Sequence, residues 1–346
     1  MEKIVFLDCS SGGGQLVRTA LTLSTILKIP VEFENIRKNR PNPGLQAQHL
    51  AGVKALEQMG AKTKNAVIGA SKMSFIPPEK IDFEKLFLDV GTAGSVTLVM
   101  QTLLLPLVFS NSAKTVEIKG GTHVKWSPTA DYFEKVFLPS ARKFGVNAKM
   151  RLLKHGFYPQ GGGIIEITVK PSRKLSSTEF LGKGKLETLE GISAVSNLPL
   201  EIAERQKKSI LKTLVSENIS PKIKVESVQS ESQGTFVFLQ AGFETITAGF
   251  SSLGEKGKPA DKVGEECALK FLEFSNSQES VDEHLGDQLI PIMALAGGKS
   301  SINAKLTDHF LSNIRVCEQF LPVKFSVEGR TGEIGSVEVE GIGFEL

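Results

Sequence analysis

The sequence predicts an α/β (α+β) fold, with three repeated units of helices packed on small sheets and a smaller inserted α/β domain. Stretches with the hydrophobic period of a helix alternate with short apolar runs typical of strands. A glycine-rich turn followed by a helix, a strand and a second helix occurs three times. A stretch of different character separates the second copy from the third. Because each unit must bury its apolar face, we expect helices layered on sheets.

Length and composition are those of an ordinary soluble globular protein. The 346 residues suffice for a full core and two domains, with 40% hydrophobic and 23% charged residues. No apolar run approaches the ~20 residues of a membrane span, and Met1–Phe6 is typical of a strand rather than a signal peptide. Cys9, Cys267 and Cys317 are too few and scattered for a disulfide framework or zinc site, so we expect a reducing, cytoplasmic setting and no membrane partner.

The first two copies of the pattern occupy the N-terminal half. The first is expected to contain a strand at 4–8, a helix at 15–24, a strand at 31–33 and a helix that ends at Gly60. In the second copy, Gly91 to Ser95 open a helix, a strand follows at 116–118, and a Pro128-started helix ends near Gly145. These copies predict that turns rich in glycine or arginine lie at the helix starts.

The third copy lies near the C-terminus. Gly286 is expected to open a helix that Gly297 and Gly298 end, and after a strand Thr307 or Asp308 caps a second helix. This places His309 in the first turn of that helix, where the helix dipole disfavours the imidazolium form. The ring would then be a neutral nucleophile or base, although a lone histidine is more often structural or simply exposed.

The segment between the second and third copies predicts a separate module. Strands at 190–195, 222–228, 235–241 and 245–250 accompany helices at 200–217 and 259–274. Residues 182–184 and 275–277 are the expected hinges. We therefore predict a discontinuous large catalytic domain formed by 1–180 and 278–346, and a small inserted domain formed by 181–277.

Three arginines indicate an anion site. Arg18, Arg37 and Arg40 lie near glycine-rich helix starts, and no acidic residue occurs between Asn35 and His49. The planar guanidinium matches phosphate oxygens, so the group favours phosphate binding over solvated surface arginines. The run Gly12-Gly13-Gly14 could cradle a phosphate or could form a tight turn; it is neither a P-loop nor a Rossmann fingerprint.

Several motifs are shared with one enzyme family. The most diagnostic is His-Gly-Phe-Tyr-Pro-x-Gly-Gly-Gly at 155–163. The others are Gly-Gly-Gly-Gln at 12–15, Arg-x-x-Arg-x-x-Pro-Gly at 37–44, Gln48-His49-Leu50, Gly94-Ser95-x-Thr97-Leu98-Val99, Gly286-Asp287-Gln288-Leu289 and Thr307-x-His309-x-x-Ser312-Asn313. Through them the chain resembles the RNA 3′-terminal phosphate cyclases over about residues 1–172 and 281–325, whereas the insert agrees in position and shape. The family's three repeats and inserted domain agree with the fold predicted above.

The resemblance implies an ATP-dependent reaction on RNA ends that carry a 3′-phosphate. The product is a 2′,3′-cyclic phosphate, formed through a covalent histidine–AMP intermediate and an RNA-adenylate, with Mg²⁺ or Mn²⁺ as cofactor. His309 occupies the position of the nucleophile, and Asp287 or Asn313 would orient its ring. The resemblance assigns phosphate or RNA binding to Arg18, Arg37, Arg40, Gln48 and His49, and ATP binding to Gln101, Pro128, His284, Asp287 and Gln288.

Two positions depart from the family pattern. Ser11 stands where the family has a glutamate that helps to hold the metal on ATP, so Asp8 is the remaining candidate metal ligand. His284 replaces the family's tyrosine, which packs on the adenine opposite Pro128. The missing glutamate favours an alternative function, a non-catalytic RNA-binding relative in ribosome assembly. An enolpyruvyl-type transferase is a further alternative that would leave 155–163 unexplained, and the oligomeric state is open.

Overall fold

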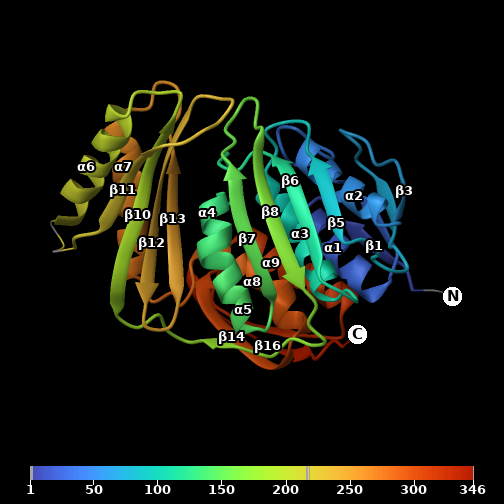
Figure 1. Ribbon diagram of the computed structural model, residues 1–346. Coiled ribbons are helices and arrows are strands. Elements are labelled where there is room, and N and C mark those ends of the chain that lie inside the picture. Colours follow the sequence, from blue (N-terminus) through green and yellow to red (C-terminus); the bar gives the residue numbers. More distant parts are fainter. Residues whose placement is uncertain (1–2, 216, 218, 346) are drawn as a thin grey trace.

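Four small sheets and their helices make up the protein. The computed structural model describes residues 3–215, 217 and 219–345, and its described strands form four four-stranded sheets. Three sheets surround a central group of helices, and the fourth lies to one side with its own helices (Figure 1). The predicted α/β class is therefore confirmed. Two predicted elements include residues outside the described ranges. These residues are Met1 and Glu2 of the strand predicted at the N-terminus and Ser216 of the helix predicted at 200–217.

The first repeat contains two more strands than its pattern predicts. Its elements are β1 (Val5–Asp8), α1 (Gly14–Leu27), β2 (Val31–Glu34), α2 (Ala47–Gln58), β3 (Lys62–Lys64) and β4 (Met73–Ile76). The strand order is β1-β2-β4-β3, with β1 parallel to β2 and β4 antiparallel to both its neighbours. Strand β3 has no hydrophobic alternation, because its side chains are exposed or half-buried, whereas β4 alternates with Met73 and Phe75 buried.

The second repeat has the same topology. Its elements are β5 (Lys85–Asp89), α3 (Val96–Val108), β6 (Lys114–Gly120), α4 (Ala130–Tyr132), the π-helical turn η1 (Phe133–Phe137), α5 (Leu138–Lys143), β7 (Asn147–Lys154) and β8 (Gly163–Lys170). The order β5-β6-β8-β7 again pairs a parallel couple with an antiparallel hairpin. The predicted helix between 128 and 145 is thus confirmed as α4, η1 and α5 in succession.

The third repeat is interrupted by the insert. Its elements are β9 (Glu179–Phe180), α8 (Glu283–Leu295), β14 (Gly297–Lys305), α9 (Asp308–Phe320), β15 (Phe325–Glu328) and β16 (Ile334–Ile342). Read from β9, the order β9-β14-β16-β15 repeats the arrangement of the other two sheets. All three copies predicted from the sequence are therefore present, each completed by a first strand and a final hairpin.

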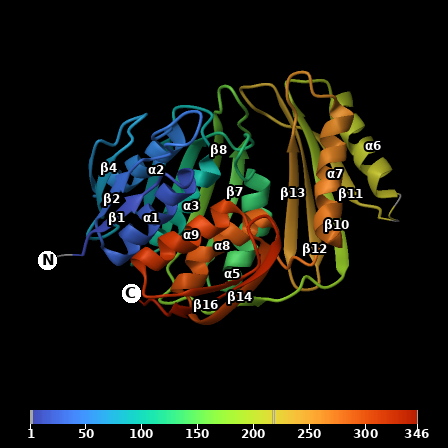
Figure 2. The ribbon, with the colours of Figure 1, turned by 180° about the vertical axis from the view of Figure 1, so that it is seen from behind.

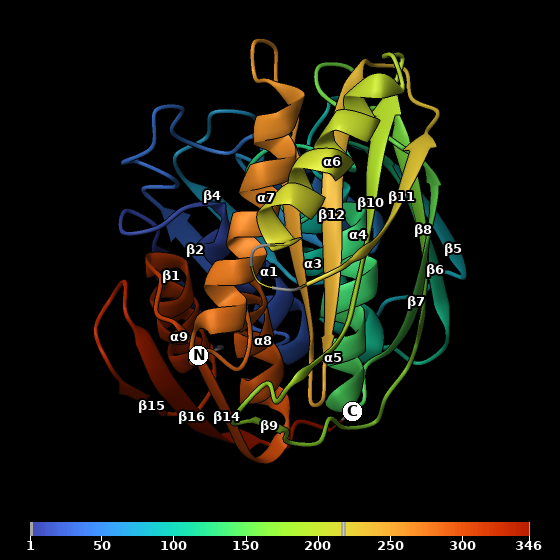
Figure 3. The same ribbon diagram turned by 90° about the vertical axis from the view of Figure 1, so that its left-hand side faces the viewer.

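The insert has a sheet of its own. It contains β10 (Leu186–Ser196), α6 (Glu201–Val215), β11 (Lys222–Ser227), β12 (Gly234–Phe243), β13 (Thr247–Leu253) and α7 (Ala260–Asn276). Helices α6 and α7 cover one face of the sheet, whose order is β11-β10-β12-β13 (Figure 3). The hinge expected at 275–277 is wrong in part, because α7 continues through Asn276 and Ser277 is its C-cap. The domain boundaries themselves stay a prediction.

Side-chain caps decide where the helices of the site begin. Asp282, not Gly286, opens α8, because its carboxylate accepts the N–H groups of His284 and Leu285. Gly286 lies inside the helix, where an added Cβ would come within 2.9 Å of the Phe310 ring. The Thr307 hydroxyl caps α9 by accepting the Phe310 N–H. Ser95 caps α3 and Thr129 caps α4, so Gly91 and Pro128 precede those helices rather than start them.

The helices of the three repeats pack on one another at the centre. Helix α1 contacts α3 of the second repeat and α9 of the third, and α8 lies against α9 (Figure 2). This arrangement brings the first turns of α1 and α9 together. Among the described residues, no helix combines the length and the apolar character needed to cross a membrane.

Candidate active site

Hydrogen bonds between buried side chains join α1, α8 and α9. The Gln15 amide donates to the Ser312 hydroxyl at 3.0 Å, and the Thr19 hydroxyl donates to Asn313 Oδ1 at 2.8 Å. The Asn313 amide in turn donates to the backbone carbonyl of Asp287 at 3.0 Å. These bonds fix the first turn of α9, which carries His309, against α1 and α8.

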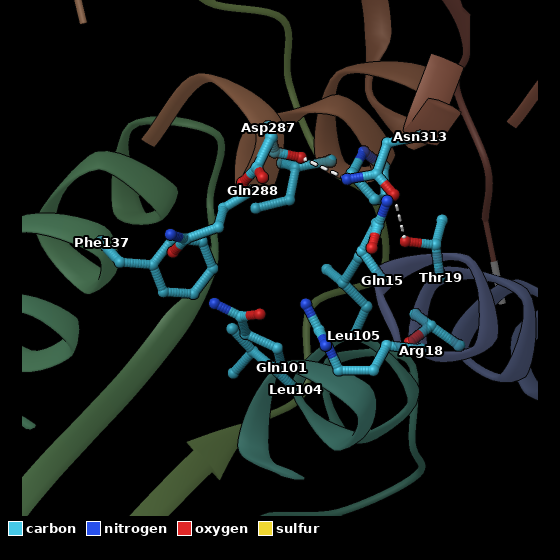
Figure 4. A pocket seen from close by; sticks show the side chains of 13 residues that line it. Gln15, Arg18, Thr19, Gln101, Leu104, Leu105, Phe137, Asp287, Gln288 and Asn313 are labelled. Carbon is cyan, nitrogen blue, oxygen red and sulfur yellow. Dashed lines mark hydrogen bonds between the residues drawn. The ribbon is translucent and has the colours of Figure 1, made fainter. Parts of the chain in front are cut away.

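A cavity of about 50 Å³, lined by both polar and apolar residues, lies between these helices and α3 (Figure 4). Four residues predicted from the sequence line it, namely Arg18, Gln101, Asp287 and Gln288. The cavity is also lined by Gln15, Thr19 and Thr22, which the sequence prediction did not include as site residues, and by Asn313, which it named as a possible partner of the His309 ring. In Figure 4 the Arg18 side chain extends into the space between the helices, and the Gln288 side chain extends toward Phe137.

Unpaired polar atoms surround this cavity. Gln15 Oε1, Gln101 Nε2 and Gln288 Oε1 are buried and have no hydrogen-bond partner among the described residues. A buried polar atom without a partner costs about 1–3 kcal/mol, so a polar ligand that supplies the missing bonds would be stabilised here.

The neighbours of His309 define its protonation. Its Nε2 lies 3.3 Å from Arg40 Nη2, and its Nδ1 lies 3.9 Å from Asp287 Oδ2. A guanidinium can only donate, so Nε2 accepts and the proton resides on Nδ1, on the side of Asp287. Burial, together with the positive charges of Arg18 and Arg40, lowers the pKa of the imidazole. The ring is therefore neutral at neutral pH, with a lone pair on Nε2.

Asp287 rather than Asn313 faces the His309 ring. The side-chain amide of Asn313 is already bonded to Thr19 and to the Asp287 backbone. Burial raises the pKa of the Asp287 carboxyl to about 7, against the opposing positive charges of His284 and Arg18. A small change in its surroundings can therefore change the charge beside the ring at neutral pH.

His49 presents a buried donor to the start of α1. Its Nδ1 accepts the backbone N–H of Gln46 at 3.1 Å, so the proton lies on Nε2, which has no partner among the described residues. Burial and the charges of Arg18 and Arg37 lower its pKa to about 3, which keeps the ring neutral. An added Cβ at Gly14 would lie 1.9 Å from Nε2, so only glycine fits between the helix start and this ring.

The three arginines lie close to one another, and none of them forms an ion pair with a carboxylate of the described residues. Arg37 donates to the Asn42 carbonyl oxygen at 3.1 Å, and Arg40 contacts His309. Burial lowers the pKa of Arg18 to about 10, and burial together with the charge of Arg40 lowers that of Arg37. Cations held this close to one another stabilise a bound anion.

The remaining predicted residues lie at the edge of this group. Gln48 accepts the backbone N–H of Ser95 at 3.4 Å. Pro128 precedes the cap of α4, and His284 is exposed in the first turn of α8. The two helix starts are joined because the Tyr132 hydroxyl donates to Asp282 at 2.6 Å and the Tyr132 ring meets the His284 ring edge-on. The adenine position between Pro128 and His284 stays a prediction.

Asp8 does not have the surroundings of a metal site. Its oxygens accept the Ser10 N–H at 2.9 Å, the Ser10 hydroxyl at 3.0 Å and the Asn35 amide at 3.1 Å. Within the described part of the chain, no three His, Cys, Asp or Glu side chains gather as metal ligands would. A single, already bonded carboxylate does not fit a protein-held divalent ion.

A sequence signal for the missed residues was present in α1. Gln15, Arg18, Thr19 and Thr22 follow helical spacing and form one polar stripe on a helix that is otherwise apolar up to Leu23. The helix is buried around most of its circumference, so these polar groups face a site inside the protein rather than solvent.

Comparisons with known proteins agree on one family. A family model described as RNA 3′-terminal phosphate cyclase matches residues 9–327. A protein of that name from Pyrococcus furiosus is 41% identical over 342 residues, which cover 97% of this chain and 98% of the relative. Another from Saccharolobus solfataricus is 43% identical over 321 residues, covering 92% and 94%.

One solved structure is similar at a much lower level. The enolpyruvyl transferase NikO from Streptomyces tendae matches 99% of this chain and 49% of its own, with 11% identity and a TM-score of 0.40. Neither the fold nor the activity of that protein transfers to this chain at such a level.

Proposed function

Because this chain belongs to the RNA 3′-terminal phosphate cyclase family of enzymes, we propose that it converts an RNA 3′-phosphate into a 2′,3′-cyclic phosphate at the expense of ATP. The reaction proceeds through AMP bound to His309 and then through an RNA-adenylate. Family membership argues against the enolpyruvyl transferase alternative, and the relatives named as cyclases argue against the ribosome-assembly alternative.

The observation that carries the proposal is the neutral His309 ring beside the arginines. Its Nε2 lone pair attacks the α-phosphorus of ATP, the bond to the bridging oxygen breaks, and pyrophosphate leaves. The Nδ1–H remains on the side of Asp287, whose carboxylate stabilises the cationic imidazole of the intermediate. Arg40 contacts the same Nε2 before ATP binds, so the incoming phosphate must take the place of the ring as its partner.

The later steps transfer AMP and close the ring. An oxygen of the RNA 3′-phosphate attacks the AMP phosphorus, and the phosphorus–nitrogen bond to His309 breaks. The ribose 2′-hydroxyl then attacks the 3′-phosphorus, loses its proton and expels AMP. Arg18, Arg37 and Arg40 would bind the phosphates in these steps, with the His49 N–H as a neutral donor.

ATP and a divalent ion are part of the proposal. The unpaired amides of Gln101 and Gln288 support a polar ligand beside His309. Because the chain offers no cluster of metal ligands among the described residues, the nucleotide phosphates would have to hold the ion. We also infer a cytoplasmic setting, which the free, buried thiols of Cys9, Cys267 and Cys317 support.

Labelling with α-labelled ATP tests the nucleophile. We expect a covalent, acid-labile AMP adduct on the denatured protein, located in the peptide that contains His309. The His309→Ala variant should lose this adduct while its circular dichroism remains that of the folded protein. Full labelling of that variant would disprove the assignment. Absence of any adduct in the unaltered protein, with RNA still bound, would favour the ribosome-assembly alternative.

A further inference from the structure

The turn between β6 and α4 carries an aromatic side chain that the proposed chemistry does not use. Trp126 is the chain's single tryptophan and is 94% exposed. Its φ of 58° lies in the left-handed region, an outlier for a bulky side chain. The Ser127 hydroxyl donates to the Val124 carbonyl oxygen at 3.0 Å and closes the turn. The fold therefore holds a large apolar ring in solvent, in a backbone conformation that costs free energy.

A fixed cation accompanies the indole. Lys125 Nζ lies 5.7 Å from the centre of the Trp126 ring and pairs with Glu255 at 2.6 Å, in the loop between β13 and α7 of the insert. The insert thus holds the lysine beside the indole. An exposed ring next to a cation suits single-stranded nucleic acid, whose bases stack while its phosphates attract the charge.

A second exposed aromatic residue lies on the neighbouring hairpin. The N–H groups of Thr122 and His123 donate to the Gly156 carbonyl oxygen at 2.9 and 3.1 Å, which ties the turn to the hairpin between β7 and β8. Tyr158, on that hairpin, is 78% exposed. Trp126 and Tyr158 are therefore carried by two segments that are hydrogen-bonded to each other. Figure 1 shows these segments at one end of the second repeat's sheet, where β6 ends and β8 begins.

Hydrogen bonds lead from this turn to the phosphate site. The Pro128 carbonyl oxygen accepts the Thr97 hydroxyl at 2.8 Å, and that hydroxyl contacts the Ser95 hydroxyl at 2.8 Å. The Ser95 N–H donates to Gln48, the residue before His49. The turn is thus continuous with the residues that would hold the terminal phosphate. Ser95 and Thr97 are buried, so these bonds fix the turn next to Gln48 and His49, and an RNA strand anchored there by its 3′-phosphate would have the exposed indole nearby.

We propose that the indole of Trp126 stacks on a nucleobase of the bound RNA close to its 3′ end. This rests on the proposed function, because the 3′-phosphate is what places the strand. The ligand is an RNA base rather than the adenine of ATP, because the resemblance places the adenine between Pro128 and His284. Stacking is tolerant of base identity, so the contact would add affinity without a strong sequence preference.

Fluorescence of the single tryptophan gives a direct test. An RNA oligonucleotide with a 3′-phosphate, added without ATP, should quench Trp126 emission saturably. The same oligonucleotide with abasic sites at its last positions should bind with little quenching. Equal quenching by the abasic oligonucleotide would overturn the proposal. Quenching by ATP but not by RNA would also overturn it and assign the indole to the nucleotide.

Kinetics of variants provide the second test. We expect Trp126→Ala to raise the RNA KM by about tenfold and Trp126→Phe, which keeps a ring, by much less. Phe87→Ala is the matched control, because Phe87 is 52% exposed on β5 and lies outside this surface. An unchanged RNA KM in Trp126→Ala would overturn the proposal. So would an equal loss in RNA-independent adenylylation, because that outcome assigns the residue to ATP.

Failure of the two proposals would look different. Adenylylation measured without RNA reports the proposed function alone, whereas quenching by RNA needs no ATP. If the protein forms the AMP adduct but RNA does not quench its fluorescence, the proposed function stands and the stacking contact is disproved. If the protein forms no adduct, the proposed function is disproved. If 3′-phosphorylated RNA also fails to quench the fluorescence, the stacking contact is disproved as well.

Discussion

At the scale of single residues, two neighbours on opposite sides of the ring decide how His309 can react. Arg40 selects Nε2 as the acceptor, and Asp287 lies on the side of the Nδ1 proton. Positive charge that develops on the ring during attack is stabilised only when Asp287 is ionised. The raised pKa of that carboxyl, about 7, therefore couples the charge of one buried acid to the chemistry of the ring.

This coupling predicts a pH dependence. At limiting ATP, the adenylylation rate should rise with pH with a midpoint at about 7, as Asp287 loses its proton. The pKa of His309 lies below its ordinary value, so its own protonation lowers the rate only at more acidic pH. In Asp287→Asn the step at about pH 7 should vanish, leaving a lower, flat rate. An unchanged step would instead assign it to another group.

The arginines give a second prediction at this scale. Alanine at Arg18, Arg37 or Arg40 should lower cyclisation at limiting ATP and RNA by about tenfold to a hundredfold, because each removes a charge-assisted phosphate contact. Lysine at these positions should restore only part of the cyclisation activity, since it lacks the planar guanidinium group. Arg205→Ala is the control, because Arg205 is paired with Asp261 on the surface of the insert. Losses equal to that control would mean the three are ordinary surface arginines.

At the scale of elements, the start of α1 depends on its contact with α2. The capping box of α2 fixes His49, and Gly14 at the first position of α1 leaves room for the ring. The requirement at Gly14 is one of space, because an added Cβ would overlap His49 Nε2. The glycine and the histidine are therefore expected to be energetically coupled.

A double-mutant cycle tests this coupling. Gly14→Ala should lower the free energy of unfolding by about 1–3 kcal/mol, because the methyl group overpacks the site. In the His49→Ala background the same substitution should cost little, because the ring is gone. Gly182→Ala is the control, since an added Cβ there meets nothing within 4 Å. Additive effects of Gly14→Ala and His49→Ala in urea denaturation would contradict the steric explanation.

At the scale of the whole molecule, an aromatic cluster joins the insert to the second repeat. Phe236 of β12 is fully buried, and its ring centre lies 4.1 Å from that of His123. His123 is held in turn by Asp131 at 2.9 Å. Two polar contacts flank the cluster, Lys154 with Glu231 and the Gln160 N–H with Ser232. The insert is thus packed against the loops that carry the 155–163 motif.

Loss of this ring should destabilise the protein. We expect Phe236→Ala to lower the free energy of unfolding by about 3–5 kcal/mol, because it leaves a cavity where the insert meets the second repeat. Leu269→Ala, at an exposed position on α7, should change it by about 0.5 kcal/mol or less. Similar small effects of both substitutions in denaturant titrations would show that the cluster contributes little to this contact.

The sequence by itself determined the features that depend on local pattern. Spacing and residue type predict the three repeats, a cap at Thr307 or Asp308, the place of His309 in the first turn of α9 and the group of arginines. The short strands β3 and β9 escaped prediction because they are too short to show alternation. Their pairing depends on strands that lie elsewhere in the chain.

Only the tertiary structure decided the chemistry of the site. The tautomer of His309 depends on Arg40, which lies 269 positions earlier in the chain, and the partner of Gln15 on α9 is equally remote. Between Asp287 and Asn313, both at plausible spacing from His309, the packing of α1 against α9 engages Asn313 and leaves Asp287 facing the ring. Contacts of this kind are set by how whole helices pack, and hydrophobic period and capping carry no information about which distant side chains will meet.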